Sequence, residues 1–165
     1  MDERRPVRFR ELLRALVDGR VEFIVVGGVA AVLEGAPVST FDLDVVYALG
    51  EGNLKRLTKA LDGLGAVYVD PGGRQISPNL ERLRGGGHHL LRTHFGRLDV
   101  MGSIGAERGF DDLLPESKPR AIHGLTVNVL TLKAVIATKE AAGREKDRAV
   151  LGLLRQILAE RDDRG

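Results

Sequence analysis

The sequence contains no cysteine and no tryptophan, and aromatic residues make up only 4% of its 165 residues. Without cysteine there can be neither a disulfide framework nor a thiolate metal site, and nothing points to an oxidising compartment. The shortage of aromatic rings argues against a platform on which single-stranded nucleic acid stacks its bases. The missing residue types therefore exclude disulfide-stapled domains and argue against base-stacking modules.

Long hydrophobic runs are also missing. No apolar stretch approaches the roughly 18 residues of a membrane-spanning helix. The first residues, MDERRPVRFRELL, are charged and lack the apolar centre of a signal peptide. We therefore expect no membrane partner and, by default, a cytoplasmic location.

The remaining composition is that of a soluble globular domain, with 43% hydrophobic and 29% charged residues. The net charge is +2 and the pI about 9.1, a mild basic excess spread among alternating charges. A polyanionic ligand is compatible with this charge, but a solvated mixed surface is the better explanation of most of it. The length suits one domain, residues 1–165, with its own core.

Apolar periodicity predicts helices and short β-branched runs predict strands. The predicted helices cover residues 9–17, 29–35, 52–64, 131–142 and 145–160. The predicted strands cover residues 22–26, 40–47, 67–69, 89–93, 96–101 and 125–129. Residues 70–87 are predicted to form a long excursion. The order predicts an α+β fold, a mixed β-sheet with helices packed on it, with a core at about 21–129 and a helical C-terminal third at about 131–160.

Asp42 and Asp44 are two residues apart in an otherwise apolar strand, TFDLDVVY. Residues two apart in a strand face the same way, so both carboxylates share one face of the sheet. Adjacent like charges resist ionisation, and a divalent cation such as Mg²⁺ compensates them well. The alternative is a pair of solvated aspartates on an edge strand, but Asp is disfavoured in strands and the flanking residues are apolar.

Two further features are weaker when taken alone. Asp99 is the one acidic residue of a later apolar strand, GRLDVMG, where it is either a third metal ligand or a surface residue. Gly27-Gly28 follows a strand and precedes a helix. A glycine turn there lets a phosphate approach the free N–H groups of the helix start, although it could equally be a plain tight turn.

Together these pieces resemble the nucleotidyltransferase superfamily of the DNA polymerase β type. The glycine pair, then STFDLD at 39–44, then a lone Asp99 follow that family's order. Small stand-alone bacterial and archaeal members show a similar GGVAAVLEGAP segment and a C-terminal segment like LTLKAVIATKEAAGREKD. The resemblance runs from about Val21 to Asp147.

The resemblance implies roles for individual residues. Asp42, Asp44 and Asp99 would be catalytic and would bind Mg²⁺ (or Mn²⁺), with Asp99 also accepting the proton of the attacking hydroxyl. The nucleotide-binding set implied is Gly27, Gly28, Ser39, Thr40, Lys133 and Lys139, with Arg144 and Lys146 as further basic residues. The partners implied are a nucleoside triphosphate and an acceptor such as a tRNA end, a protein or a small molecule. Several such relatives are toxins of toxin–antitoxin pairs, which would add an antitoxin protein.

This sequence departs from the family pattern in two places. Pro37-Val38-Ser39 lacks the basic residue that relatives often carry before the aspartate pair, and Glu34 replaces a usual His. These departures favour an alternative, a catalytically inactive nucleotide- or RNA-binding module of the same fold that acts through a partner.

Overall fold

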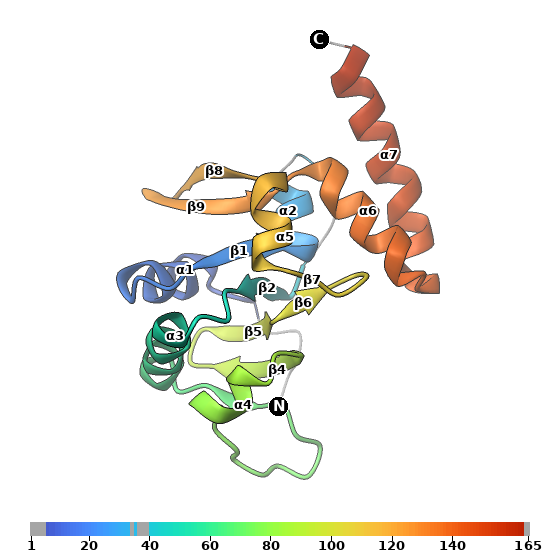
Figure 1. The fold of residues 1–165 in the computed structure, drawn as a ribbon. Helices are drawn as coiled ribbons and strands as arrows, with labels where there is room; N and C mark the ends of the chain where they lie inside the picture. Colours follow the sequence, from blue (N-terminus) through green and yellow to red (C-terminus); the bar gives the residue numbers. More distant parts are fainter. Residues whose placement is uncertain (1–5, 34, 36–39, 164–165) are drawn as a thin grey trace.

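A seven-stranded mixed sheet runs through the computed structural model, which describes residues 6–33, 35 and 40–163 (Figure 1). Its strands are β1 (Phe23–Val26), β2 (Asp42–Tyr47), β3 (Val67–Tyr68), β4 (His88–Thr93), β5 (Gly96–Met101), β8 (Ser117–Ile122) and β9 (Leu125–Leu130). They lie in the order β3-β4-β5-β2-β1-β9-β8. The β2–β5 and β1–β9 pairs are parallel and the other neighbours antiparallel. Strands β6 (Ser103–Ile104) and β7 (Arg108–Gly109) form a separate hairpin.

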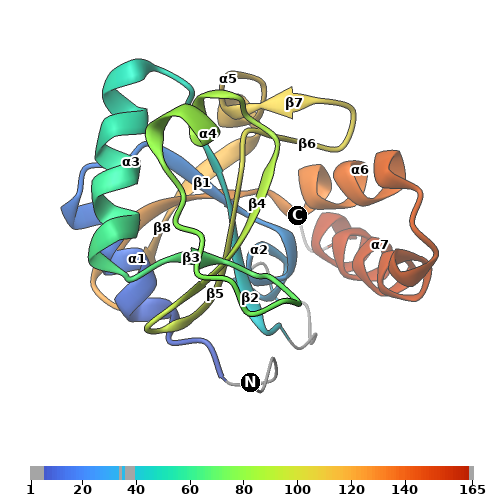
Figure 2. The ribbon, with the colours of Figure 1, turned by 90° about the horizontal axis from the view of Figure 1, so that it is seen from below.

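Helices cover the two sides of this sheet. They are α1 (Phe9–Asp18), α2 (Gly27–Leu33), α3 (Glu51–Gly63), α4 (Leu80–Arg84), α5 (Phe110–Leu113), α6 (Leu132–Ala142) and α7 (Arg148–Asp163), with 3-10 turns at Leu114–Glu116 and Glu145–Asp147. Helices α1 and α3 lie on one side and α6 and α7 on the other (Figure 2). Helix α2 packs on β2 and on α6. The predicted α+β fold with a helical C-terminal third is confirmed.

Successive side chains of β2 and β5 point to opposite faces of the sheet, and one of these faces is buried. Leu43 and Val45 of β2, and Leu98 and Val100 of β5, are completely buried on the face opposite Asp42. Burying such a side chain contributes roughly 1.5–3 kcal/mol. Because β1 lies near the middle of the sheet, all four of its residues are buried. The apolar half of each strand thus fixes which residues face the other way.

The sequence patterns missed α4, α5, β6, β7 and β8. Helix α4 lies inside the predicted excursion 70–87, where Asn79 caps it by accepting a hydrogen bond from the N–H of Arg82 at 2.8 Å. Five residues between glycine and proline are too short for apolar periodicity to register. Strand β8 was missed because it alternates charged residues around Pro119, a pattern that only an edge strand tolerates.

Two helix starts were also wrong. Helix α2 begins at Gly27 rather than after the glycine pair, so both glycines belong to its first turn. The last helix begins at Arg148, and Glu145–Asp147 forms a 3-10 turn before it. Helix α6 is close to expectation: Thr131 accepts a bond from the N–H of Ala134 at 3.3 Å, and the chain leaves the helix through left-handed Gly143.

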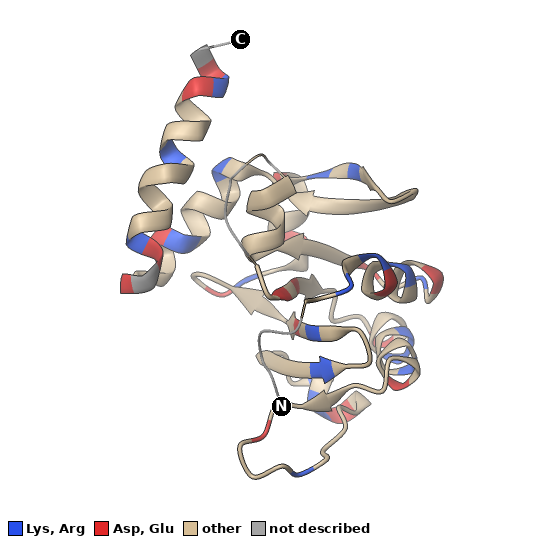
Figure 3. Ribbon diagram, turned by 180° about the vertical axis from the view of Figure 1, so that it is seen from behind, with Lys and Arg blue, Asp and Glu red and all other residues tan. Residues whose placement is uncertain are grey.

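Charges of both signs are mixed on the helices rather than gathered by sign (Figure 3). The sign of the charge changes along α1, from Arg10 to Glu11 to Arg14, and along α3, from Glu51 to Lys55. The basic excess therefore forms no single-sign face on these helices. Within the described residues, none of the helices combines the length and apolar character needed to cross a bilayer.

Candidate functional site

Three carboxylates meet where β2 and β5 run side by side. Asp42 and Asp44 project from the same face of β2, as strand parity predicts. Asp99 on β5 is the direct register partner of Asp44. One oxygen from each of the three side chains lies within 4.8 Å of the others. That spacing and that ligand chemistry suit a hard divalent cation.

The three carboxylates are electrostatically frustrated when no cation is bound. Burial, together with the charges of Asp42 and Asp99, raises the pKa of Asp44 to about 8. Burial and a hydrogen bond with Asp42 raise the pKa of Asp99 to about 6, although nearby Arg97 opposes the rise. A divalent cation would relieve both shifts, because it favours the ionised form of each ligand. The residues present therefore fit a metal centre.

Gly27 brings bare backbone against the carboxylates. Its φ of 67° is left-handed, and a Cβ at this position would overlap the Oδ2 atom of Asp44. The cause is the antiparallel register in which Val26 pairs with Asp44, so that the next residue turns directly over that side chain. Gly28 is similarly close to Thr40, where an added Cβ would lie 3.2 Å from the Thr40 Cβ atom.

Thr40 borders the same region at the entry to β2. Its hydroxyl donates a hydrogen bond to the main-chain carbonyl of Asp42 at 2.9 Å, which holds the start of the strand. Ser39, the other hydroxyl residue expected to bind nucleotide, lies outside the described residues, as do Glu34 and Pro37-Val38.

These groups line one large cavity of about 1220 Å³, which is ample for a nucleotide together with an acceptor. Its described walls include the three aspartates, Gly27, Gly28 and Thr40. Helix α6 supplies another wall through Val135, Thr138, Lys139 and Ala142. These four residues recur at helical spacing, so α6 turns a single face toward the carboxylates.

Solved structures similar to this chain are nucleotidyltransferases. A candidate nucleotidyltransferase from Thermotoga maritima, TM1012, is 18% identical, with a TM-score of 0.57 over 92% of this chain and 91% of that one. ANT(2")-Ia, solved with adenylyl-2"-tobramycin, is 15% identical, with a TM-score of 0.58 over 92% and 86%. The lincomycin-bound lincosamide adenylyltransferase LnuA is 12% identical, with a TM-score of 0.58 over 90% and 95%.

This chain has the nucleotidyltransferase fold. The likeness extends over 90–92% of this chain and 86–95% of each neighbour. No protein-family model matches the sequence. No curated protein matches it either.

The nucleotidyltransferase fold brings only one of the two predicted lysines to the cavity. Lys139 lines it and is mostly buried, whereas Lys133 is exposed and lies outside the described lining. Six residues along an α-helix correspond to about 120° of rotation, so the two side chains cannot share a face. Helical spacing alone would have separated them.

Asp147 pairs with Lys139 on helix α6 and with Arg144, which follows that helix. The sequence patterns did not identify Asp147 as a site residue. It is 5% exposed and bonds both the Lys139 ammonium at 3.1 Å and the Arg144 Nε at 2.9 Å. Burial opposes its ionisation, but the hydrogen bond and charge of Lys139, reinforced by Arg144, outweigh it and lower its pKa. All three residues line the cavity. Asp147 therefore orients two cations toward the site.

Arg97 is a second residue that the sequence patterns did not single out. It precedes Asp99 by two residues on β5, so it shares the face of the carboxylates, and it pairs in register with Asp42. Its Nη2 atom lies 3.2 Å from the Oδ1 of Asp99. A basic residue at i−2 of a candidate ligand in a strand is the signal that could have found it.

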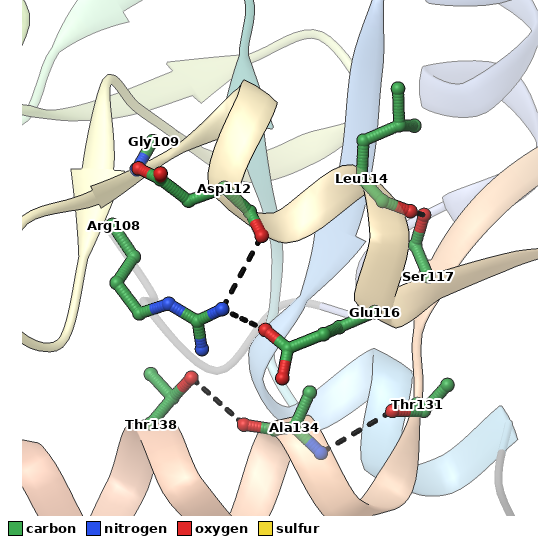
Figure 4. Close-up of polar contacts among 9 residues, drawn as sticks. All are labelled: Arg108, Gly109, Asp112, Leu114, Glu116, Ser117, Thr131, Ala134 and Thr138. Carbon is green, nitrogen blue, oxygen red and sulfur yellow. Dashed lines mark hydrogen bonds and ion pairs between the residues drawn. The ribbon is translucent and has the colours of Figure 1, made fainter.

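The β6–β7 hairpin forms a further wall of the cavity, through Ser103, Ile104, Gly105 and Glu107. Figure 4 shows how it is anchored: Arg108 donates to the Asp112 carbonyl at 3.3 Å and forms an ion pair with Glu116. The tip passes close to α6, where an added Cβ on Gly105 would lie 3.5 Å from Thr138. The hairpin and α6 therefore face the carboxylates as one surface.

Proposed function

We propose that this chain is a metal-dependent nucleotidyltransferase, which moves a nucleotidyl group from a nucleoside triphosphate to an acceptor hydroxyl. The observation that carries the proposal is the convergence of three carboxylates within 4.8 Å, at a cavity also lined by a glycine pair and a buried lysine. The nucleotidyltransferase fold of the chain supports it.

Asp42, Asp44 and Asp99 would hold the divalent cations, Mg²⁺ or Mn²⁺. Such ions would act as Lewis acids that offset the charge on the phosphate groups. The bare backbone at Gly27 and Gly28 would let the triphosphate approach the aspartates, because neither glycine has a side chain that would occupy the space beside them. Lys139 approaches from α6 as a point charge for the phosphates.

Asp99 would take up the proton of the acceptor hydroxyl, since it lies in register with Asp44 and is ionised once cations are bound. The acceptor oxygen forms a bond to the α-phosphorus as the bond between that phosphorus and the β-bridging oxygen breaks. The electron pair of the broken bond leaves with pyrophosphate, and the hydroxyl proton passes to Asp99. The products are the nucleotidylated acceptor and pyrophosphate.

One structural neighbour is an adenylyltransferase by name and another was solved with an adenylylated antibiotic, so ATP is the first donor to test. Labelled ATP, GTP, CTP and UTP are incubated with Mg²⁺ and either total RNA, cell lysate or small alcohols. We expect label transfer by the native protein, none by Asp44→Asn, and normal transfer by Asp62→Asn, which removes an exposed carboxylate. Folded protein that transfers no label to any acceptor would refute the proposal.

The same assay separates the alternative, an inactive nucleotide- or RNA-binding module. Such a module would bind a triphosphate in calorimetry only when Mg²⁺ is present, yet transfer nothing. The toxin hypothesis rests on the sequence resemblance alone and is tested by expression in a bacterial host. Growth arrest by the native chain and none by Asp44→Asn would support it, and an adjacent gene that relieves the arrest would identify an antitoxin. Equal growth of both strains would oppose it.

A further inference from the structure

The cavity has two chemically different sides, divided by β2. On one side lie α2 and α6, which bring Gly27, Gly28 and Lys139. On the other side lie β5 and β4, which bring His88, Leu90 and Arg97. We name these last three residues the β4–β5 shelf. If the triphosphate occupies the glycine and lysine side, the acceptor approaches Asp99 over this shelf.

The shelf continues the carboxylate face outward along the sheet. Leu90 is the register partner of Asp99, and His88 is that of Met101, so their side chains project beside the carboxylates. Leu90 is 45% exposed, which is unusual for a leucine in the middle of a strand. Phe41, 52% exposed, lines the cavity as well. A bound acceptor would therefore meet apolar surface next to the reacting group.

Arg97 gives the shelf its charge. Apart from Asp99 itself, β4 and β5 add no carboxylate to the described lining of the cavity. Within the described residues, the Nε–H of Arg97 is buried and has no hydrogen-bond partner, so its ion pair with Asp99 leaves the guanidinium incompletely satisfied. Once cations share the charge of Asp99, Arg97 remains positive, since a guanidinium does not deprotonate in proteins.

We propose that Arg97 selects an acceptor alcohol that carries a phosphate group close to its hydroxyl. A guanidinium presents a planar fork of donors that matches phosphate oxygens, and Leu90 with Phe41 contacts the carbon skeleton. An acceptor bearing ammonium groups would instead be repelled by Arg97. The inference rests on the proposed function, and its chemistry fits either a small phosphorylated alcohol or the end of a nucleic acid.

The first test compares matched acceptors in the transfer assay: glycerol 3-phosphate with glycerol, ribose 5-phosphate with ribose, and a short RNA with a free 3′ hydroxyl. We expect the phosphorylated member of each small pair to be preferred. Arg97→Gln should raise the KM of the phosphorylated member about tenfold more than that of the neutral member, which corresponds to the loss of one charge-assisted hydrogen bond. Preference for the RNA over glycerol 3-phosphate and ribose 5-phosphate would identify a nucleic-acid acceptor. The opposite preference would identify a small-molecule acceptor.

Two variants control this comparison. Arg92→Gln removes the cation that pairs with Arg97 in register on β4 but does not line the cavity, so the phosphate preference should survive. Arg97→Lys keeps the charge but lacks the planar fork of guanidinium donors, so it should retain part of the preference for the phosphorylated acceptor. This variant also tests the inference if Arg97→Gln fails to fold. A merely structural role of Arg97 would raise the KM of charged and neutral acceptors equally, and that result would overturn the inference.

A second readout needs no turnover. With Mg²⁺ and a non-hydrolysable ATP analogue filling the nucleotide side, glycerol 3-phosphate is titrated while the Nε–Hε resonance of Arg97 is followed by NMR. We expect a saturable shift that glycerol does not cause. A shift without any transfer would support phosphate binding by Arg97 and would refute the proposed function. Transfer at equal rates to charged and neutral acceptors, with no shift of the resonance, would refute the selection of a phosphorylated acceptor by Arg97 and leave the proposed function standing.

Discussion

Asp44 on β2 and Asp99 on β5 are direct partners in a parallel register, although they are far apart in the sequence. This pairing places a third carboxylate beside a pair that already shares one face of β2. Burial raises the pKa of both residues, and the neighbouring Asp42 carboxylate raises both further. The consequence is a group of ligands that is costly to keep ionised until a cation binds.

The stability of the metal-free protein should therefore fall as pH rises. Below about pH 4, Asp44 is protonated in both the folded and the unfolded chain and contributes nothing. Between about pH 4 and its folded pKa of about 8, the unfolded chain releases the proton more readily, which favours unfolding. Asp44→Asn should remove this penalty and raise the free energy of unfolding at pH 7 by up to about 4 kcal/mol, about 1.4 kcal/mol for each pH unit above about pH 4.

Denaturant unfolding in EDTA across this pH range measures the effect, with Asp62→Asn, an exposed carboxylate on α3, as the control. Added Mg²⁺ should stabilise the native protein and leave Asp44→Asn unchanged, because only the native site gains a ligand-bound cation. A variant that is destabilised at pH 7 without metal would contradict the assignment of strain to Asp44.

Gly27→Ala should damage the metal centre as well as the fold. The left-handed backbone costs a Cβ-bearing residue about 1–2 kcal/mol, and here the new Cβ would also overlap the Asp44 carboxylate. Gly124→Ala is the matched control, since its φ of 80° is equally left-handed but no atom lies within 4 Å of the added Cβ. Both variants should lose stability, but only Gly27→Ala should lose the stabilisation by Mg²⁺, as thermal unfolding with and without the ion would show.

Lys139 and Lys133 lie on the same helix and should differ in function. Lys139→Met should weaken triphosphate binding about tenfold, the loss of one hydrogen bond to a charged group. Lys133→Met should change it less than about twofold, because that side chain is exposed outside the described lining of the cavity. Isothermal calorimetry with a non-hydrolysable ATP analogue measures both. Equal losses would mean that helix α6 is not the wall that faces the phosphates.

Asp147→Asn should loosen the basic wall that Lys139 and Arg144 form. A buried carboxylate bonded to two cations is lost, so the free energy of unfolding should fall by about 1–3 kcal/mol. The KM for the triphosphate should rise while the KM for the acceptor stays unchanged. The comparison is Glu140→Gln, which breaks an exposed ion pair with Arg155 and should cost less than about 0.5 kcal/mol. Normal triphosphate KM in Asp147→Asn would contradict its role in orienting Lys139.

Local patterns in the sequence determined the larger elements and part of the site. Strand parity placed Asp42 and Asp44 on one face because alternation is a property of any extended strand. Apolar periodicity likewise located α1, α3 and α6, since burial of one face selects the residues. Short or charged elements such as α4 and β8 gave no such signal, because capping and edge pairing stabilise them instead.

Only the tertiary structure decided which distant residues join the site. The parallel pairing of β2 with β5 delivers Asp99 and Arg97, and no local pattern specifies which strands become neighbours. The return of α6 across the cavity selects Lys139, and the turn after it buries Asp147 against that lysine. Burial then raises the pKa of Asp44 and Asp99, because desolvation depends on what packs around a group rather than on its sequence neighbours.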